Sequence, residues 1–589
     1  MDLHFTSAEP TPEEKDAIDS VAIPGVENRL KRSYLLPVLH AIQNHVGWIS
    51  PGALNYASRV LEIPPAEAFG VADFYALFST KPQAAVAHVC DDIACQVYGA
   101  EKLCAEVAQT LGPEGSLWRR SPCLGLCDRA PAALVHVAGR EHSECAIAPA
   151  NVDDISKALQ RISIPQPSLS ACVPQRGEPG LKLLRRVGQV DPENLDDYRA
   201  SGGFLALRRA IEMKPQRVIR EVIESKLVGR GGAAFPTGQK WNSIISTPQP
   251  RYLVCNADES EPGTFKDRVL MEGDPFALIE AIVIAAFATG CERGYIYIRG
   301  EYPIAKRRLE RAIEQCYARG LLGTDILGAG LRFDIEVRVG AGAYICGEET
   351  AMLNSIEGKR GEPRNKPPFP TEVGLFGKPT LIQNVETLLN IPHIVLEGGN
   401  AFAAVGTERS TGTKLFCVSG HVLKPGVYEV PFGTTLRQLL DLAGGLGGTG
   451  KLQAVLLGGA AGAFLAPSEL ETPLTFEGAR AAGATLGSAV IMAFDGTVDL
   501  RRILLRIAAF FRDESCGQCV PCRIGTVRQE EILHRLQKGK GLGSVASELV
   551  TLKELSQAMR DASICGLGQT ASSAVESAVS KFRIFQDTP

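Results

Sequence analysis

The sequence lacks a marked excess of charge of either sign. Its 62 Lys and Arg residues nearly balance 66 Asp and Glu residues, and the formal net charge is only -4. A protein with this balance has no global field that would hold nucleic acid or an anionic membrane surface. We therefore expect no nucleic-acid partner.

The sequence also lacks a long uninterrupted apolar run and a leader pattern. Its most apolar window, 276–290, contains Glu280 and is shorter than the roughly 20 apolar residues that cross a bilayer. The N-terminus (MDLHFTSAEPTPEEKD) is acidic and does not have the basic-then-apolar order of a secretory signal. These two absences predict a cytoplasmic protein with no direct membrane insertion.

The composition is that of a folded, multidomain protein. The chain has 589 residues, of which 45% are hydrophobic and 22% charged, and about 150 residues per domain predicts about four domains. Apolar periodicity and the Gly and Pro content indicate a multidomain α/β and α fold. The expected segments are a helical region (28–82), a small α/β domain (83–162), a linker (163–190), a large α/β domain (191–410), a β-rich domain (411–496) and a helical domain (497–589).

Half of the 16 cysteines form two groups, which in a reducing cytosol favours metal ligation over disulfides. In the C-terminal group Cys516, Cys519 and Cys522 are three residues apart, and Cys565 is the distant fourth thiol. Three closely spaced thiols with a distant fourth are typical of a [4Fe-4S] cluster. Structural zinc, which usually takes two separated pairs, is the weaker alternative.

The N-terminal group consists of two pairs, Cys90 with Cys95 and Cys123 with Cys127. Two pairs on two loops suit a flat [2Fe-2S] cluster, and zinc is the alternative, although neither pair has the CxxC spacing of zinc ribbons. The other eight cysteines are scattered and are interpreted as small buried hydrophobes. They are Cys104, Cys145, Cys172, Cys255, Cys291, Cys316, Cys346 and Cys417.

A glycine-rich loop and two acidic segments are candidates for a nucleotide site. The loop GRGGAAFPTGQKW (229–241) could cradle a phosphate with its backbone N–H groups. It lacks the full GxGxxG order, and the second glycine cluster, 457–464, is expected to be structural. The segments NADESEPGTF (256–265) and GAGAYICGEE (340–349) each follow a predicted strand. Their carboxylates suit ribityl and ribose hydroxyls, whereas either one alone would be interpreted as a solvated turn.

Six motifs occur in a fixed order: GRGGAAFPTGQKW, CNADESEPGTFKD, GAGAYICGEET, KPPFP, CGQCVPCRIG and ICGLG. With them, residues 190–589 resemble the NADH-oxidising flavoprotein subunit of respiratory complex I and its soluble relatives. The N-terminal cysteine pairs resemble the thioredoxin-like small subunit that accompanies this flavoprotein, so the chain looks like a fusion of the two. The resemblance implies a thioredoxin-like [2Fe-2S] domain, a Rossmann-like FMN and NADH domain, a ubiquitin-like, soluble-ligand-binding β-rich domain, and a helical [4Fe-4S] domain.

The resemblance also implies roles for individual residues. The residues implied to surround FMN are Gly229, Arg230, Gly231, Lys240, Asn256, Asp258, Tyr344, Gly347, Glu348 and Asn384, and further cofactor-binding candidates beside them are Gly232, Glu259 and Gln383. Phe235 and Phe369 would contact the adenine of NADH. Lys366 and Glu349 would contact its polar parts, and Glu261 is the catalytic candidate near the nicotinamide. Gln383 stands where the family commonly has asparagine, and Ser243 where complex I flavoproteins typically have an aromatic residue.

The implied function is that of a diaphorase subunit, which transfers hydride between NAD(H) and FMN and single electrons between FMN and the clusters. The fused architecture resembles first the diaphorase subunit of NAD-reducing [NiFe] hydrogenases and second the β subunit of NAD-dependent formate dehydrogenases. The NADH-input subunit of complex I is a third candidate. The implied partners are an iron–sulfur relay subunit and a large catalytic subunit. A non-catalytic iron–sulfur scaffold is the alternative from a different class.

Overall fold

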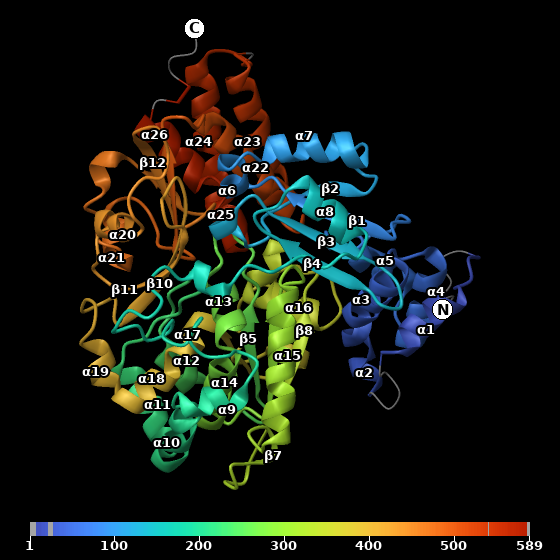
Figure 1. The fold of residues 1–589 in the computed structure, drawn as a ribbon, viewed down its shortest axis with the longest axis vertical. Coiled ribbons are helices and arrows are strands. Elements are labelled where there is room, and N and C mark those ends of the chain that lie inside the picture. Colours follow the sequence, from blue (N-terminus) through green and yellow to red (C-terminus); the bar gives the residue numbers. More distant parts are fainter. Residues whose placement is uncertain (1–6, 22–26, 540, 583, 586–589) are drawn as a thin grey trace.

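The computed structural model describes residues 7–21, 27–539, 541–582 and 584–585. In Figure 1 the chain begins with a small helical region that packs beside a four-stranded sheet. The helices of this region are α1 (Pro12–Asp19), α2 (Asn28–Lys31), α3 (Leu35–Val46), α4 (Pro51–Leu61) and α5 (Pro65–Ala72). Helix α4 begins as the Ser-Pro signal predicts, because the Ser50 hydroxyl accepts a hydrogen bond from the Ala53 N–H at 3.0 Å. Helix α1 precedes the segment predicted to be helical and is fixed by a capping box between Thr11 and Glu14.

The next module is a four-stranded sheet of order β2-β1-β3-β4. Its strands are β1 (Ala85–Cys90), β2 (Trp118–Ser121), β3 (Ala133–Val137) and β4 (Ser143–Ile147), and its helices are α6 (Ile93–Val97), α7 (Ala100–Leu111) and α8 (Val152–Leu159). β1 is parallel to β2 and antiparallel to β3. Cys90 is the last residue of β1, Cys95 lies in α6, and Cys123 and Cys127 follow β2; the parallel pairing of β1 and β2 brings their carboxyl ends to one edge of the sheet.

The proline-rich segment predicted to be a linker is packed against the rest of the protein. Cys172, Val173 and Val187 are buried in the main core. The Glu429 carboxylate accepts hydrogen bonds from the backbone N–H groups of residues 182, 183 and 184 at 2.9–3.1 Å. This segment has no apolar periodicity of its own. It is held in place by Glu429, which lies in a strand more than two hundred residues further along the chain.

The central module is built on a sheet of order β7-β8-β6-β5-β9. Its strands are β5 (Tyr252–Ala257), β6 (Arg293–Ile298), β7 (Gly323–Ile326), β8 (Leu331–Val339) and β9 (Thr380–Asn384). The helices before its last strand are α9 (Leu195–Ala200), α10 (Leu205–Met213), α11 (Pro215–Glu224), α12 (Thr237–Ile244), α13 (Lys266–Gly273), α14 (Pro275–Thr289), α15 (Pro303–Ala318) and α16 (Glu349–Ile356). They are followed by α17 (Val385–Leu389), α18 (Ile391–Glu397) and α19 (Gly399–Ala403). Strands β5, β6, β8 and β9 are parallel, so both acidic segments and Asn384 lie at one edge.

The most apolar window of the sequence forms α14, which is buried along nearly its whole length in the central module. Its one charged residue, Glu280, accepts hydrogen bonds from the Tyr198 hydroxyl at 2.5 Å and from the Phe204 and Leu207 N–H groups at 2.7 and 2.9 Å. Such bonds satisfy a buried carboxylate. None of the helices in the described ranges is long and apolar enough to span a membrane.

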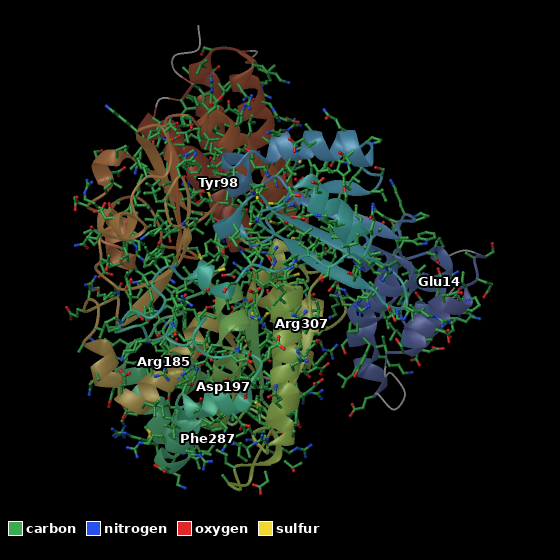
Figure 2. The ribbon with its side chains drawn as sticks, in the orientation of Figure 1. Glu14, Tyr98, Arg185, Asp197, Phe287 and Arg307 are labelled. Atoms are coloured by element: carbon green, nitrogen blue, oxygen red, sulfur yellow. The ribbon has the colours of Figure 1, made fainter. Side chains whose placement is uncertain are left out.

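The last two modules are a β insert and a group of helices. The insert has strand order β11-β10-β14-β12-β13. Its elements are β10 (Thr413–Gly420), β11 (Gly426–Pro431), α20 (Leu436–Leu442), β12 (Leu452–Leu457), β13 (Ala463–Leu465), α21 (Phe476–Ala481) and β14 (Val490–Asp495). The C-terminal helices are α22 (Leu500–Glu514), α23 (Val520–Gln537), α24 (Val545–Ala562), α25 (Gly566–Thr570) and α26 (Ser573–Phe582). The modules are tied together by side chains such as Tyr98, whose hydroxyl donates to the Gly420 carbonyl at 2.6 Å (Figure 2).

Candidate functional site

A cavity of about 400 Å³ lies at the carboxyl edge of the parallel strands. Loops from the central module, the β insert and the C-terminal helices line it. Ten of the residues that the sequence assigns to FMN or NADH are in this lining: Gly231, Gly232, Asn256, Asp258, Glu259, Glu261, Tyr344, Gly347, Glu348 and Asn384. The fold therefore brings together residues that are up to 153 positions apart, from Gly231 to Asn384.

One wall of the cavity is formed where β5 ends. The Asn256 side chain donates to the Gly347 carbonyl at 2.9 Å and accepts from the Asp258 N–H at 3.1 Å, which holds the two acidic segments together. Asp258 Oδ1 accepts from the Ser260 hydroxyl at 3.3 Å, whereas Oδ2 is buried without a partner. Burial raises the pKa of Asp258 well above its usual range. An unpartnered buried carboxyl oxygen suits a ligand hydroxyl, which can donate to it.

The cavity lining also contains a buried cation that the sequence analysis did not single out. Lys266 Nζ lies 2.8 Å from an Asp267 carboxylate oxygen and 3.0 Å from Glu386. Burial alone would lower the pKa of Lys266, but these carboxylates raise it above its usual value. Asp267 in turn accepts from the Asn384 amide at 2.7 Å. The available signal was its place directly after the acidic segment, in GTFKD.

Gly231 and Gly232 of the glycine-rich loop face the cavity near this cation. A Cβ on Gly231 would lie 3.1 Å from the Asn384 Cβ, so the backbone can approach only because the residue is glycine. Gly232 has a φ of +126°, which L side chains rarely adopt. Backbone N–H groups beside a buried ammonium suit a phosphate group.

Glu261 connects the acidic segment to the β insert. Its carboxylate accepts hydrogen bonds from the Ser488 hydroxyl at 2.6 Å and from the Ala461 N–H at 3.0 Å. Burial raises the pKa of Glu261 to about 7. A Cβ on Gly459 would lie 2.6 Å from this carboxyl group. Gly458 and Ala461 of the glycine cluster 457–464, which is expected to be structural, are part of the cavity lining.

The Glu259 carboxylate is engaged by the protein itself. It accepts from the Asp267 and Arg268 N–H groups, both at 2.9 Å, and from the Tyr302 hydroxyl at 3.1 Å. The two N–H groups belong to the first turn of α13, so Glu259 satisfies donors that have no partner within that helix. Burial raises the pKa of Glu259 to about 7. This residue supports the cavity wall more than it offers a free acceptor.

Two exposed aromatic rings lie outside the cavity lining, next to a row of alternating charges. Phe235 and Phe369 are 50% and 52% exposed. Lys240 Nζ is 5.7 Å from the centre of the Phe235 ring and 3.8 Å from Glu349. Lys366 pairs with Glu349 at 2.8 Å and with Glu348 at 3.0 Å. Exposed rings beside cations suit a base and a phosphate of a dinucleotide.

Four residues predicted for the FMN site lie outside the cavity lining: Lys240, which is beside Phe235, and Gly229, Arg230 and Gln383. The Arg230 side chain is fully buried, donates to the Thr411 carbonyl at 2.7 Å and lies over the Phe432 ring. Burial lowers its pKa to about 10. Its side chain thus supports the glycine-rich loop from behind, and its assignment to the surroundings of FMN stays a prediction. The Gly229 N–H donates to the Phe235 carbonyl at 2.9 Å, and the Gln383 amide nitrogen is buried without a partner outside the lining.

The C-terminal cysteines meet beside the cavity. Cys516 and Cys519 lie in the connection from α22 to α23, and Cys522 is in the first turn of α23. Cys565 directly precedes α25, and a Cβ on Gly568 of α25 would lie 2.9 Å from the Cys522 Cβ. Burial raises the pKa of the Cys522 thiol to about 12 and that of Cys565 to about 11. Residues 566, 567 and 570 of the same short helix line the cavity.

The N-terminal cysteines form a compact buried group. All four are 1–3% exposed, and the Cys123 and Cys127 sulfurs are 3.3 Å apart. Hydrogen bonding with Cys123 and Cys95 raises the pKa of Cys90 well above its usual value. Among the residues that the structure describes, no three His, Cys, Asp or Glu side chains form a site for a metal ion. The chemistry of the donor set still suits a two-iron cluster, which takes thiolate ligands: the four buried thiols come from the end of β1, from α6 and from residues 123–127.

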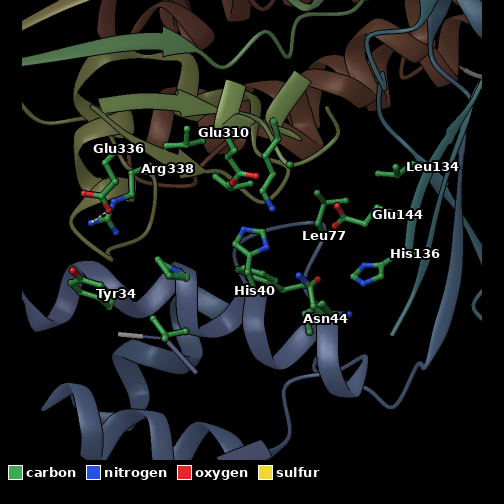
Figure 3. A pocket seen from close by; sticks show the side chains of 18 of the residues that line it. Tyr34, His40, Asn44, Leu77, Leu134, His136, Glu144, Glu310, Glu336 and Arg338 are labelled. Atoms are coloured by element: carbon green, nitrogen blue, oxygen red, sulfur yellow. Dashed lines mark ion pairs between the residues drawn. The ribbon is translucent and has the colours of Figure 1, made fainter. Parts of the chain in front are cut away.

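A second cavity, of about 300 Å³, lies between the N-terminal helices, the four-stranded module and the central module. The side chains of His40 and His136 border it, together with Asn44 and Glu144 (Figure 3). Burial lowers the pKa of His40 to about 4, so this ring is neutral at pH 7. None of the site residues predicted from the sequence is among the described residues that line this cavity. The candidate site is therefore the first cavity.

Four family models match the chain. They are the thioredoxin-like [2Fe-2S] ferredoxin over residues 25–160, the Nuo51 FMN-binding domain over 222–393, the SLBB domain over 415–460, and the NADH-ubiquinone oxidoreductase-F iron-sulfur binding region over 502–585. Together with the cavity and the two cysteine groups, they define a flavin and iron–sulfur oxidoreductase.

Relatives of known sequence cover most of the chain. An NADH-quinone oxidoreductase F subunit of Rhizobium meliloti (strain 1021) is 46% identical over 404 residues, which are 68% of this chain and 95% of that protein. The NADP-reducing hydrogenase subunit HndC of Solidesulfovibrio fructosivorans is 44% identical over 400 residues, 68% of this chain and 81% of that protein. The chain belongs to the family of NADH-quinone oxidoreductase F subunits.

A solved structure resembles almost the whole chain. A chain of the NAD+-reducing [NiFe]-hydrogenase in the air-oxidized state is 32% identical, with a TM-score of 0.79, over 95% of this chain and 94% of that one. The predicted fold class, the electron-transfer role and the cofactors FMN, NAD(H), [4Fe-4S] and [2Fe-2S] are thus confirmed at the level of domains. The individual ligands remain predictions.

Proposed function

We propose that the chain is the diaphorase subunit of an NAD-reducing hydrogenase, with an iron–sulfur relay subunit and a large catalytic subunit as partners. The observation that carries this proposal is architectural. The thioredoxin-like module, the FMN-binding domain, the β insert and the iron–sulfur helices occur in one chain, and the hydrogenase chain matches it along 95% of its length. A cytoplasmic location remains a prediction from the sequence.

The cavity residues have complementary roles in holding FMN. The N–H groups of Gly231 and Gly232 and the ammonium of Lys266 would bind its phosphate. The free Asp258 oxygen would accept from a ribityl hydroxyl. When bound, FMN supplies the exchange between a two-electron hydride and single electrons.

NADH would approach over the charged row outside the cavity. The exposed rings of Phe235 and Phe369 can stack on adenine, while Lys366, together with Lys240, which the sequence analysis placed around FMN, can bind the pyrophosphate. Glu261, with a pKa near 7, lies where the acidic segment meets the β insert and would orient the nicotinamide. The protein's contribution is to position and desolvate these groups.

The C-terminal cysteines are the proposed ligands of the [4Fe-4S] cluster, and the N-terminal cysteines those of the [2Fe-2S] cluster. Two contacts connect the first group to the cavity. Helix α25 both follows Cys565 and lines the cavity. The Tyr344 N–H donates to the Glu514 carboxylate at 2.7 Å, two residues before Cys516. The short connection favours electron exit through the C-terminal cluster.

The first test is anaerobic purification with flavin and iron analysis, followed by NADH-dependent reduction of an artificial acceptor. The proposal predicts bound FMN and acceptor reduction, whereas a non-catalytic scaffold would have neither. The Glu261→Gln variant keeps the size of the side chain. We expect it to lose NADH-dependent acceptor reduction while it retains both clusters.

The second test identifies the parent complex. Purification of the intact complex should yield hydrogen-dependent reduction of NAD+. Formate-dependent reduction instead would assign the chain to a formate dehydrogenase, and quinone-linked NADH oxidation would assign it to complex I.

A further inference from the structure

Two loops that serve different cofactors are joined by buried cations. The first loop, 123–128, carries two of the N-terminal cysteines, and the second, 259–261, lines the flavin cavity. Arg268, Arg299 and Tyr302 contact both loops and are each only 1–2% exposed. These contacts lie inside the protein and tie the thioredoxin-like module to the central module.

Arg299 follows β6 and makes the most direct connection. One guanidinium nitrogen donates to the Glu259 carbonyl at 2.5 Å, and the other donates to the Cys123 carbonyl at 2.7 Å. The second nitrogen also donates to the Glu301 carboxylate at 2.5 Å. The rigid, planar fork of arginine allows one side chain to serve both carbonyl groups, which a single ammonium group does less well.

Arg268 and Tyr302 reinforce the same connection. Arg268 donates to the Gly125 carbonyl at 3.0 Å and to Asp128 at 2.8 Å, while its own N–H donates to Glu259. The Tyr302 hydroxyl donates to the Glu259 carboxylate at 3.1 Å. A Cβ on Gly125 would lie 2.2 Å from that hydroxyl, so the cysteine loop approaches the central module at its backbone.

We propose that Arg299 is a positioning residue that holds the Cys123 loop against the Glu259 loop and favours reduction of the two-iron cluster through its positive charge. The proposal rests on the assignment of the N-terminal thiols as cluster ligands. Removal of the guanidinium would leave Glu301 as an unpaired buried carboxylate next to the loop. A nearby negative charge disfavours the addition of an electron, and more so in a medium of low dielectric constant.

The test compares Arg299→Gln and Arg299→Lys with Arg307→Gln, a control on the exposed face of α15. EPR-monitored redox titration gives the midpoint of the two-iron cluster, and hydrogen exchange reports on the two loops. For Arg299→Gln we expect a lower midpoint, equivalent to at least a tenfold change in the oxidised-to-reduced ratio, or about 59 mV for one electron. Both loops should exchange faster. The midpoint potential of Arg299→Lys should stay close to the wild-type value, although the two loops should still exchange hydrogen faster. The control should change neither readout.

Several outcomes would overturn the proposal. An unchanged midpoint potential of the two-iron cluster in Arg299→Gln would contradict the electrostatic role. Faster hydrogen exchange in only one loop would contradict the connection between the two loops. If Arg299→Gln does not fold, normal exchange in Arg299→Lys would contradict the positioning role. A wild-type chain without a two-iron EPR signal would instead contradict the assigned ligands, a failure that is visible before any variant is measured.

Discussion

The two cysteine groups use the same ligand chemistry in very different surroundings. The N-terminal thiols are 1–3% exposed and lie behind a network of buried arginines. Cys516 and Cys519 are partly exposed, and Val520 and Ile524 of the adjoining helix are 60% and 47% exposed. This difference is consistent with the proposed exit of electrons through the C-terminal group, since the N-terminal group is enclosed by protein.

The largest effect should come from removing one proposed ligand from each cysteine group, which tests directly whether the two groups differ in function. Cys519→Ala should reduce electron transfer to the partner complex by at least about 100-fold, the upper range for loss of a contact that supports a metal ligand. Reduction of the flavin by NADH should stay largely intact. The measurement pairs stopped-flow flavin absorbance with turnover of the complex.

The matched variant is Cys95→Ala in the N-terminal group, which should leave turnover largely intact. Equal loss of turnover in both variants would contradict the proposed exit route. Equal loss of flavin reduction and turnover in Cys519→Ala would contradict the separation of the cavity from the C-terminal cluster.

A second variant tests the metal of the enclosed group. Cys90→Ser should lower the iron content by about two atoms per chain, as expected for a two-iron cluster, while FMN and the four-iron signal remain. Elemental analysis of iron and zinc, together with EPR, measures this. Loss of zinc in place of iron would assign the N-terminal cysteines to a structural zinc site.

A third variant tests the cavity between the two groups. Glu261→Gln should reduce the rate of flavin reduction by NADH by about 10- to 100-fold, since general acid–base and positioning effects are of this order or larger. The wild-type rate should change near pH 7, where Glu261 titrates, and this step should disappear in the variant. Normal kinetics and an unchanged pH profile in the variant would contradict a role for Glu261 in flavin reduction by NADH.

The smallest effect concerns stability. The raised pKa of Glu261 means that the folded state keeps a proton that the unfolded state loses between about pH 4.5 and pH 7. Its stabilising contribution is full below that range and is lost as the pH rises through 7, up to about 3 kcal/mol for a shift of this size. Denaturation followed by the fluorescence of the three tryptophans should therefore give a flatter pH dependence in Glu261→Gln. A parallel pH dependence in both proteins would contradict the shifted pKa.

Much of the fold could be predicted from local patterns. The cysteine spacings, the strand-end acidic segments and the amphipathic C-terminal helices are local signals, and the multidomain α/β fold class that they indicate is confirmed. The apolar run 276–290 was correctly excluded as a membrane span because of its length and Glu280, and it forms the core helix α14.

The missing parts depend on contacts between distant segments. The role of Lys266 arises from Glu386, and Gly458 and Ala461 line the cavity because the β insert packs against Glu261. Arg230 has the expected position in the sequence, but its side chain turns toward Phe432 and away from the cavity. No local periodicity signals such contacts, since they are set by how modules pack and not by secondary structure.

The central claim is that NADH delivers electrons at the cavity and that they leave through the C-terminal cluster. Rapid-freeze EPR after anaerobic mixing of the holoprotein with NADH, with flavin absorbance recorded in parallel, tests it most directly. The account predicts flavin reduction followed by a reduced four-iron signal that appears within one turnover and is absent in Cys519→Ala. A flavin that is reduced without any four-iron signal in the wild type would contradict it.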